Sequence, residues 1–434
     1  MKAMDLKIEK LIYGGEGLAH QDGSTVFVPF VLPAERVTAA PVERKKKFVR
    51  ARLERVVEAS PERVVPRCPH FGVCGGCDYQ HIPYEAQLRY KQEILRETLR
   101  RIGKIDWIGD ITAHASPPWG YRNRAQWKIR PQESAPATGR GASEERCGIG
   151  YFRAHTTALC PVEQCAILSP LLAKTLEALR GALAADEWPG WLREIEAFAG
   201  VGDTKLLLTA TWDRFPSRAA ELPEKMRRLL PELESLLLRD RSRERMALDG
   251  PGFVDYEAGG RTYRVGHFSF FQVNRFLVDE LIREVAEKDE SGSLALDLFA
   301  GVGMFAAPLG ERFAHVVAVE ANPAAVRDCE AIVRPTSHVE VRSADVEQFL
   351  GSYQDKPELV VLDPPRTGLT PGAAKHLARI APARITYVSC EPPTLARDLA
   401  ILVGAGYEIA DFHLFDLFPQ TFHMEAVARL RRQP

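Results

Sequence analysis

The sequence predicts an α/β protein, in which a parallel-sheet domain follows a small β-barrel and a mixed α+β segment. From about residue 260 onward, short apolar strands alternate with helical segments, which is typical of a sheet buried on both faces. Before residue 58, short alternating runs are separated by turn signals such as Gly14-Gly15 and Asp22-Gly23, which favour a small β-barrel. The predicted segments are therefore 1–58, 59–259 and 260–434.

The composition is that of an ordinary globular protein. Hydrophobic residues make up 45% and charged residues 26% of the 434 positions, so large cores can form. No apolar run approaches the roughly 18 residues that span a bilayer, and the N-terminus lacks the apolar stretch of a signal peptide. We expect a cytoplasmic protein without a membrane partner. Disulfides are rare in that compartment, so the eight cysteines are candidates for metal binding or catalysis.

The net charge of −1 hides two basic clusters. The stretch from Arg44 to Arg55 carries seven basic residues against one acid, and YRNRAQWKIR at 121–130 interleaves four basic residues with Tyr121 and Trp127. Basic residues mixed with aromatic rings suit a nucleic acid with unstacked bases. An ordinary solvated surface explains either cluster alone equally well.

The central segment contains a predicted helix and a predicted loop. Residues from Tyr84 to about Ile102 have the spacing of a helix. The stretch 131–146 is polar and rich in Ala, Ser and Gly, so we expect a mobile loop.

Several predicted strands of the C-terminal segment end in polar or glycine-containing motifs. These are DLFAGVG at 297–303, VEAN at 319–322, SAD at 343–345 and LDPP at 362–365. Ligands of open α/β sheets bind where the carboxyl ends of the strands meet. The first turn holds only two glycines, which disfavours a dinucleotide. Glu320 is placed to bind ribose hydroxyls and Asp345 to read an adenine amino group, so S-adenosylmethionine ranks above any nucleotide cofactor.

Catalytic side chains are predicted at the same edge of the sheet. Cys390 and Asp363 each follow an apolar strand, and the near-terminal FPQTFHMEAV supplies Glu425, with His423 as a further polar group. A buried structural cysteine explains the position of Cys390 equally well. A thiolate that adds to C6 of uracil makes C5 nucleophilic, and a carboxylate can then remove the C5 proton. The shared sheet edge of Cys390 and Asp363 favours a catalytic cysteine, and these are the groups that such a reaction at uracil would need.

These motifs resemble the RNA uracil-C5 methyltransferase family, which has the Rossmann-like fold of class I methyltransferases. The resemblance implies that Cys390 is the nucleophile, that Glu425 accepts the proton and that Asp363 contacts uracil or the cofactor. Arg366 follows Asp-Pro-Pro where amino-group methyltransferases carry an aromatic residue, which argues against an exocyclic amine target. Ser389 precedes the cysteine where DNA cytosine-C5 enzymes carry proline, so no DNA partner is expected.

The same resemblance extends to the cofactor-binding positions. HFSFFQVN at 267–274 is similar to a family motif that assigns Gln272 to cofactor and substrate contacts and places Phe270 near the target base. The family's cofactor-binding positions fall on Phe299, Gly301, Glu320 and Asp345. Met304 stands where several members have asparagine, so no polar contact is assigned to it.

A cysteine loop lies in the central segment. Cys68, Cys74 and Cys77 bring three thiols onto one glycine-rich stretch, a pattern compatible with an iron–sulfur cluster or with zinc. The spacing is not the Cys-x3-Cys-x2-Cys of radical adenosylmethionine enzymes. CPHFGVCGGCDYQH is similar to the [4Fe–4S] loop of many family members, and iron–sulfur is our first choice.

The fourth cluster ligand has three candidates, Cys147, Cys160 and Cys165. The family pattern selects Cys165, because it precedes a short apolar run, and Cys160, which precedes proline, is the alternative. Uracil methylation needs no redox chemistry, so we expect the cluster to be structural or to position RNA. Cys329 is expected to be a core residue.

The N-terminal segment favours one branch of the family. GGEGLAHQDGSTVFVPFVLPAE at 14–35 resembles the TRAM domain, an OB-like RNA-binding barrel. The barrel and the cysteine loop together favour a monomeric enzyme acting on 23S ribosomal RNA, since the transfer-RNA branch generally lacks both. Transfer RNA is the alternative substrate. A non-catalytic iron–sulfur or zinc RNA-binding protein is the third hypothesis, and the presence of Cys390 and Glu425 argues against it.

Overall fold

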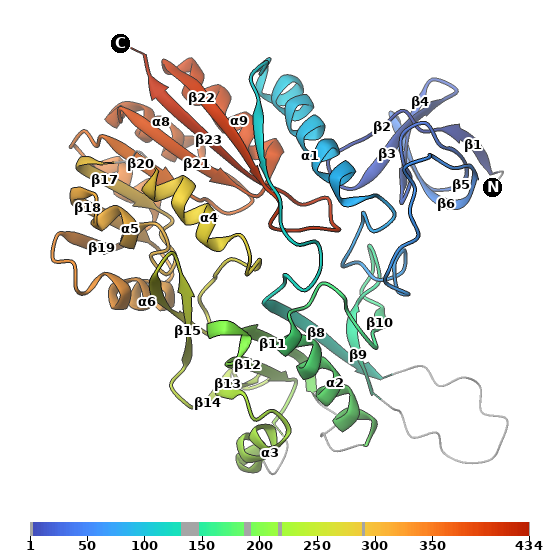
Figure 1. Cartoon of the computed structure of the whole chain (residues 1–434), viewed down its shortest axis with the longest axis horizontal. Helices are drawn as coiled ribbons and strands as arrows, with labels where there is room; N and C mark the ends of the chain where they lie inside the picture. The colour runs from blue at the N-terminus through green and yellow to red at the C-terminus, as the bar shows by residue number, and fades with distance from the viewer. Residues whose placement is uncertain (1–2, 132–146, 186–191, 216–218, 289–290, 434) are drawn as a thin grey trace. The chain divides into compact units, whose positions relative to one another are not determined.

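The computed structural model describes residues 3–131, 147–185, 192–215, 219–288 and 291–433 (Figure 1). The predicted polar loop at 131–146 lies outside the described residues except for its first position. Contacts divide the chain into two compact units. The first unit comprises residues 1–72, 76–118 and 363–434, and the second comprises residues 73–75 and 119–362.

A small β domain opens the first unit. Its strands are β1 (Met4–Lys7), β2 (Lys10–Leu11), β3 (Glu16–Gln21), β4 (Ser24–Pro29), β5 (Arg36–Arg44) and β6 (Phe48–Glu58). They form one sheet in the order β1-β5-β6-β4-β3-β2 around an apolar cluster that includes Leu6, Val26 and Val49. Asp22 and Gly23 both have positive φ at the β3–β4 turn, as a tight hairpin requires. The last strand ends at Glu58, where the sequence placed the end of the barrel.

The helix predicted from the spacing of residues 84–102 is present in the same unit. It runs as α1 (Tyr84–Thr98) and continues as a π-helical turn, η1 (Leu99–Gly103). The sequence assigned this helix to the central segment together with the following strand, β7 (Ile111–His114). In the structure β7 instead pairs in parallel with β22 (Tyr407–Phe415), close to the C-terminus.

The C-terminal strands of the first unit follow the order β21-β23-β22-β7. Strand β23 (Glu425–Arg432) is antiparallel to β22 and to β21 (Arg384–Ser389). Helices α8 (Pro371–Ile380) and α9 (Pro392–Gly404) flank β21 along the chain.

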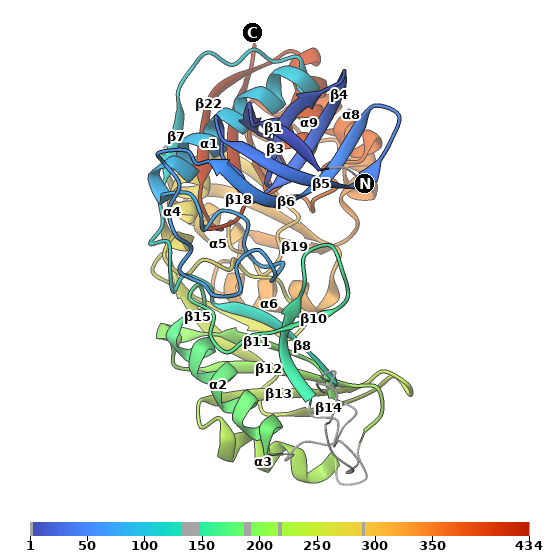
Figure 2. The same cartoon turned by 90° about the vertical axis from the view of Figure 1, so that its right-hand side faces the viewer.

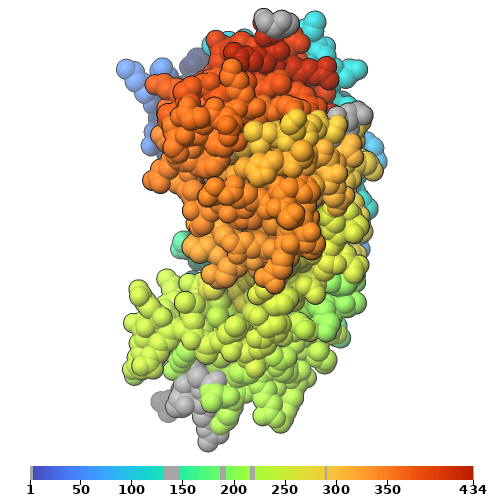
Figure 3. Space-filling model, turned by 90° about the vertical axis from the view of Figure 1, so that its left-hand side faces the viewer, coloured from blue at the N-terminus to red at the C-terminus, as the bar shows by residue number. Residues whose placement is uncertain are grey.

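The parallel sheet predicted from the apolar strands is confirmed in the second unit. Its strands are β17 (Gly292–Leu298), β18 (Phe313–Glu320), β19 (Val339–Ser343) and β20 (Leu359–Leu362). They run parallel in the order β19-β18-β17-β20. The helices along this part of the chain are α4 (Val278–Ile282) with the π-helical turn η4 (Arg283–Glu287), α5 (Ala306–Gly310), α6 (Pro323–Val333) and α7 (Val346–Ser352). In Figure 3, residues of about 300–360 form a contiguous orange surface.

A seven-stranded sheet forms the rest of the second unit. Its strands are β8 (Arg124–Pro131), β9 (Cys147–Phe152), β10 (Leu159–Pro161), β11 (Leu192–Ala199), β12 (Leu206–Trp212), β13 (Leu233–Asp240) and β14 (Arg245–Asp249), in the order β10-β9-β8-β11-β12-β13-β14. Helix α2 (Pro170–Ala184) packs on this sheet (Figure 2). Helix α3 (Leu222–Leu229) and the hairpin of β15 (Phe253–Ala258) with β16 (Arg261–Gly266) complete the unit.

The aromatic rings of the second basic cluster are not available to RNA. Tyr121 and Trp127 are both fully buried, and the Trp127 indole N–H donates to the hydroxyl of Tyr151 over 3.1 Å. Neither ring can therefore stack on a base, which removes the aromatic part of the nucleic-acid interpretation of this cluster. Trp127 faces the core together with Ala125 and Ile129, its alternate neighbours on β8, whereas Tyr121 lies before the strand.

No helix in the described part of the chain combines the length and the apolar character that crossing a bilayer requires.

Candidate active site

The predicted nucleophile sits in a strand–turn–helix. Cys390 follows β21 directly, and α9 begins two residues later at Pro392. The Ser389 hydroxyl oxygen accepts the backbone N–H of Glu391 over 3.2 Å and tightens the turn. The Cys390 side chain is half-buried. Burial raises its pKa to about 12, and the charges of Glu425 and Asp363 contribute in the same direction. The resting sulfur therefore carries a proton.

The predicted base is enclosed beside this turn. Glu425 is the first residue of β23, and its side chain is 2% exposed. Among the described residues, none forms a hydrogen bond with one of its carboxyl oxygens, Oε1. Burial raises the pKa of Glu425 well above its usual value, and the charge of Asp363 raises it further. Burial also raises the pKa of Asp363 to about 7.

The first unit thus brings together three of the residues that the sequence singled out. Asp363 raises the pKa of both Cys390 and Glu425, and Glu425 raises that of Cys390, so the three groups lie within electrostatic reach. Arg366 counteracts the rise in pKa that these acidic groups cause, because its positive charge lowers the pKa of both Cys390 and Glu425. The sequence interpretation used Arg366 only to exclude amine targets and missed this electrostatic role.

Two further residues were also missed. Tyr13, in the turn between β2 and β3, donates its hydroxyl to Glu391 over 2.9 Å, and Glu391 in turn raises the pKa of Cys390. Glu391 could have been suspected from its position next to the nucleophile. Nothing local to Tyr13 reveals its partner, because 378 positions separate the two residues.

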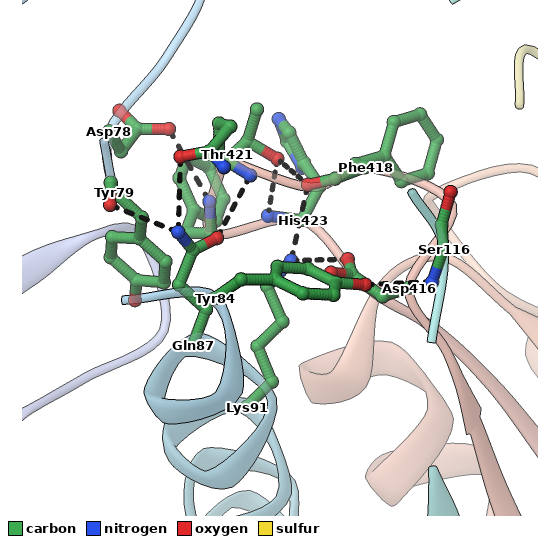
Figure 4. A network of polar contacts seen from close by, with 12 residues as sticks. Asp78, Tyr79, Tyr84, Gln87, Lys91, Ser116, Asp416, Phe418, Thr421 and His423 are labelled. Atoms are coloured by element: carbon green, nitrogen blue, oxygen red, sulfur yellow. Dashed lines mark hydrogen bonds and ion pairs between the residues drawn. The ribbon is translucent and has the colours of Figure 1, made fainter. Parts of the chain in front are cut away.

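His423, considered as a further polar group of the site, packs between aromatic rings. Its ring centroid lies 4.1 Å from that of Phe422 and 5.8 Å from that of Phe418. All three residues belong to the connection that leads from β22 to Glu425 (Figure 4). This environment favours a structural role for His423.

The glycine turn of the predicted cofactor site follows β17 in the second unit. Phe299, Gly301 and Gly303 all have positive φ, so the backbone reverses sharply after the strand. A side chain at Gly303 would meet the Cys329 sulfur at 2.9 Å, which explains why glycine is required there. The buried Cys329 is a core residue, as expected.

Glu320 ties this turn to the end of β18. Its Oε2 accepts the backbone N–H of Gly301 over 2.9 Å, and its Oε1 accepts that of Asn322 over 2.7 Å. Each carboxylate oxygen can accept more than one hydrogen bond, so acceptor capacity for ribose hydroxyls remains. The carboxylate is held in place before any ligand arrives.

The remaining predicted cofactor positions differ in their surroundings. Asp345 lies two residues beyond β19, and its Oδ1 caps α7 by accepting two backbone N–H groups. Gln272 is buried, and no residue in the described part of the chain forms a hydrogen bond with its Oε1. Phe270 is 59% exposed, which suits a ring that meets a base. Met304 is buried in the core, in line with its lack of an assigned polar contact.

The four predicted cluster ligands divide between the units. Cys68 and Cys77 belong to the first unit, and Cys74 and Cys165 belong to the second. Burial raises the pKa of Tyr151 well above its usual value, and the thiols of Cys165 and Cys74 raise it further, so both sulfurs lie near this one ring. Among the described residues, no group of three or more His, Cys, Asp or Glu side chains is arranged to hold a metal ion. The iron–sulfur site stays a prediction.

Comparison with known proteins decides the family. The sequence model of the tRNA (Uracil-5-)-methyltransferase family matches residues 341–433. The chain is 34% identical, over 98% of its length and 96% of the relative, to the 23S rRNA (uracil(1939)-C(5))-methyltransferase RlmD of Salmonella typhimurium. It belongs to the RNA uracil-C5 methyltransferase family. An RNA methyltransferase of Aquifex aeolicus is also 34% identical over 99% of this chain and 98% of that protein.

A solved structure extends the likeness to the fold. The tRNA (uracil-54, C5)-methyltransferase of Pyrococcus abyssi, in complex with S-adenosyl-L-homocysteine, is 26% identical and superimposes with a TM-score of 0.75. The match covers 98% of this chain and 100% of that one. The protein is therefore an RNA uracil-C5 methyltransferase of class I fold that uses S-adenosylmethionine as methyl donor.

Proposed function

We propose that this enzyme methylates C5 of a uridine in 23S ribosomal RNA through a covalent bond between Cys390 and C6. The observation that supports this most directly is the electrostatic grouping of Cys390, Glu425 and Asp363 at the ends of β20, β21 and β23. A nucleophilic sulfur beside a buried carboxyl group is the combination that addition and elimination at a uracil ring need.

Cys390 acts in the first half of the reaction as the nucleophile. Its thiol loses a proton to solvent, a step that Arg366 assists by lowering the pKa of the thiol. The thiolate then bonds to C6, and the electrons of the C5–C6 double bond move to C5 and the C4 carbonyl. C5 becomes nucleophilic and takes the methyl group. Bound S-adenosylmethionine supplies that group as an electrophilic methyl carbon on a sulfonium.

The second half belongs to Glu425. C5 now carries both a methyl group and its original hydrogen. The Glu425 carboxylate removes this hydrogen as a proton, the C5–C6 double bond re-forms, and the bond between C6 and sulfur breaks. Cys390 leaves as a thiolate. The buried position of Glu425 raises its pKa and makes its carboxylate a stronger base than an exposed one.

The other predicted site residues hold the two substrates. Glu320, Gly301, Phe299 and Asp345 would bind the adenosine part of the donor, and Gln272 would contact both donor and uracil. The unpartnered Oε1 of Gln272 supports this role. Phe270 would lie against the target base, and Asp363, with a pKa of about 7, can donate or accept a hydrogen bond at the ring.

The choice of ribosomal RNA rests on the relatives. The Salmonella typhimurium relative, 34% identical over nearly the whole chain, is named for 23S ribosomal RNA, and the more distant Pyrococcus abyssi enzyme is named for transfer RNA. The six-stranded N-terminal sheet is compatible with a TRAM-type RNA-binding barrel. Transfer RNA is the second candidate substrate. We further infer a cytoplasmic monomer that binds RNA and not DNA.

We also propose a [4Fe–4S] cluster on Cys68, Cys74, Cys77 and Cys165. An all-thiolate ligand set suits such a cluster, and the shared proximity of Cys74 and Cys165 to Tyr151 supports the choice of Cys165. Cys160 is 3% exposed and lies in the apolar core of the seven-stranded sheet, which makes it the weaker candidate. Methyl transfer requires no step through the cluster, so we assign it a structural or RNA-positioning role.

The test uses anaerobically purified full-length protein with labelled S-adenosylmethionine and unmodified 23S ribosomal RNA or transfer RNA. We expect 5-methyluridine in the ribosomal RNA only. RNA that contains 5-fluorouridine has no removable C5 hydrogen, so it should trap a covalent complex that Cys390→Ala abolishes. Label in transfer RNA would overturn the choice of substrate. Label without any trapped complex would overturn the covalent mechanism.

A further inference from the structure

The catalytic base is delivered by a nine-residue connection that spans residues 416–424 between β22 and β23. Glu425 follows this connection as the first residue of its strand, so the direction of its side chain depends on how the connection is held. Gln420, near the middle, has a φ of 69°. A residue other than glycine keeps this left-handed conformation only where its surroundings impose it.

Gln87 on α1 imposes the conformation of Gln420. Its side-chain Oε1 accepts the backbone N–H of Gln420 over 2.9 Å, and its Nε2 donates to the side-chain oxygen of Gln420 over 3.1 Å. The same Nε2 lies 2.9 Å from the carbonyl oxygen of Ile82, which fixes the orientation of the amide. Gln87 is fully buried, so water cannot replace these bonds.

A second contact lies one helical turn further along α1. Lys91 forms a hydrogen-bonded ion pair with Asp416 over 2.6 Å, and its Nζ also donates to the carbonyl oxygen of Phe418 over 3.2 Å. Residues four apart share one face of a helix, so Gln87 and Lys91 both point at the connection (Figure 4). Helix α1 therefore holds the connection at its start and at its middle.

The third contact comes from the end of the cysteine loop. The backbone N–H groups of Asp78 and Tyr79 both donate to the carbonyl oxygen of Gln420, each over 2.9 Å. These residues follow Cys77 directly in the chain. The same short segment that ends the predicted cluster loop thus helps to fix the connection before Glu425.

We propose that Gln87 is a positioning residue for proton abstraction, acting through Gln420 on the carboxylate of Glu425. The inference rests on the proposed function, because it concerns one step of that reaction. Glu425 acts only after the methyl group has been transferred. Cys390 lies on a different turn, which Ser389 and Tyr13 hold. Disturbing Gln87 should therefore slow the release of Cys390 from the methylated base more than its addition to C6.

The experiment compares Gln87→Met with Gln92→Met, using ordinary uridine RNA and S-adenosylmethionine. Gln92 lies on the same helix, and its Nε2 donates to the carbonyl oxygen of Ile111 over 2.7 Å, a residue of β7 outside the connection. The readouts are the covalent protein–RNA complex that survives denaturing electrophoresis and the rate of 5-methyluridine release. Gln87→Met should raise the amount of complex and slow release about tenfold, while Gln92→Met changes neither. Glu425→Gln removes the carboxylate itself, so it should give the largest build-up of complex and the slowest release.

A second variant keeps the inference testable if Gln87→Met does not fold. Gln420→Asn keeps a residue type that tolerates positive φ but has too short a side chain to meet Gln87. It should show the same build-up of complex. Equal slowing of complex formation and release, or behaviour like Gln92→Met, would overturn the inference. If the wild-type protein yields neither complex nor 5-methyluridine, the proposed function fails instead.

Discussion

Tyr13 donates its phenolic hydrogen to Oε2 of Glu391 over 2.9 Å, and Glu391 is the residue that follows Cys390. The Tyr13 ring also meets that of Phe422 edge-on, with 5.4 Å between centroids. A loop of the N-terminal β domain therefore contacts both the turn that carries the predicted nucleophile and the connection that precedes Glu425. Within the first unit, the predicted RNA-binding domain thus contacts residues close in sequence to Cys390 and Glu425.

Tyr13→Phe should lower the efficiency of methylation. The change leaves the Glu391 carboxylate without its hydroxyl donor and loosens the turn around Cys390. A hydrogen bond to a charged group contributes about 1.5–3 kcal/mol, so we expect kcat/KM to fall about tenfold or more. Steady-state methylation of ribosomal RNA measures this effect, with Tyr353→Phe on the second unit as the matched control. Unchanged kcat/KM would show that the contact is incidental.

Arg366→Gln should make Cys390 harder to ionise. Arg366 lowers the pKa of Cys390, so its removal raises that pKa further above about 12. Because the thiolate fraction rises with pH below the pKa, alkylation of Cys390 at any pH from 7 to 10 should slow. Glu391→Gln should speed alkylation, since Glu391 raises the same pKa. Iodoacetamide labelling followed by mass spectrometry of the Cys390 peptide measures both rates. The same direction of change in both variants would contradict the electrostatic account.

Glu320→Gln should weaken cofactor binding. Both carboxylate oxygens accept backbone N–H groups, and the amide would place an N–H₂ donor against one of them. The glycine turn would then lose its anchor along with an acceptor for ribose. We expect the Kd for S-adenosylhomocysteine, measured by calorimetry, to rise about tenfold, which corresponds to ~1.4 kcal/mol. Glu340→Gln, on β19 of the same sheet, should leave the Kd unchanged.

Lys91→Met should destabilise the first unit strongly. Lys91 and Asp416 are both fully buried, so the substitution leaves a buried carboxylate without its ion-pair partner. Breaking such a pair typically costs about 3–5 kcal/mol, whereas replacing both charges by apolar groups is often close to neutral. The free energy of unfolding in urea should fall for Lys91→Met and recover for most of that loss in Lys91→Met with Asp416→Leu. A loss below about 1 kcal/mol in the single variant would contradict this expectation.

Cys165→Ser and Cys160→Ser should change different properties, the iron content and the melting temperature respectively. If Cys165 is a cluster ligand, its replacement should lower the iron content and the brown colour of anaerobically purified protein. Cys160 lies in the apolar core, so serine there should lower the melting temperature while iron is retained. Iron analysis and thermal unfolding separate the two outcomes. Loss of iron in Cys160→Ser alone would reverse the assignment of the fourth ligand.

The parallel half of the catalytic sheet could be predicted because its signals are local. Largely apolar strands such as 294–298 and 316–319 indicate burial on both faces, and the glycine turn after the first of them needs backbone conformations that glycine allows. Cys390 was found in the same way, from its place at the end of an apolar strand. The position of Glu425 in a motif near the C-terminus followed from resemblance.

Contacts between distant segments depended on the tertiary structure. The sequence placed β7 in the central segment, yet this strand pairs with β22, and local composition cannot specify a partner about 300 positions away. The basic cluster with Tyr121 and Trp127 was compatible with a nucleic-acid surface, but the structure buries both rings.

The sequence by itself thus determined the fold class and the family and predicted the reacting groups, because these follow from periodicity, short motifs and resemblance. Only the tertiary structure decided how those groups are held. Tyr13 meets Glu391, and Gln87 meets Gln420, across more than 300 positions of chain in each case. Such pairings form because packing brings their elements together, and no single stretch of sequence encodes the distance between them.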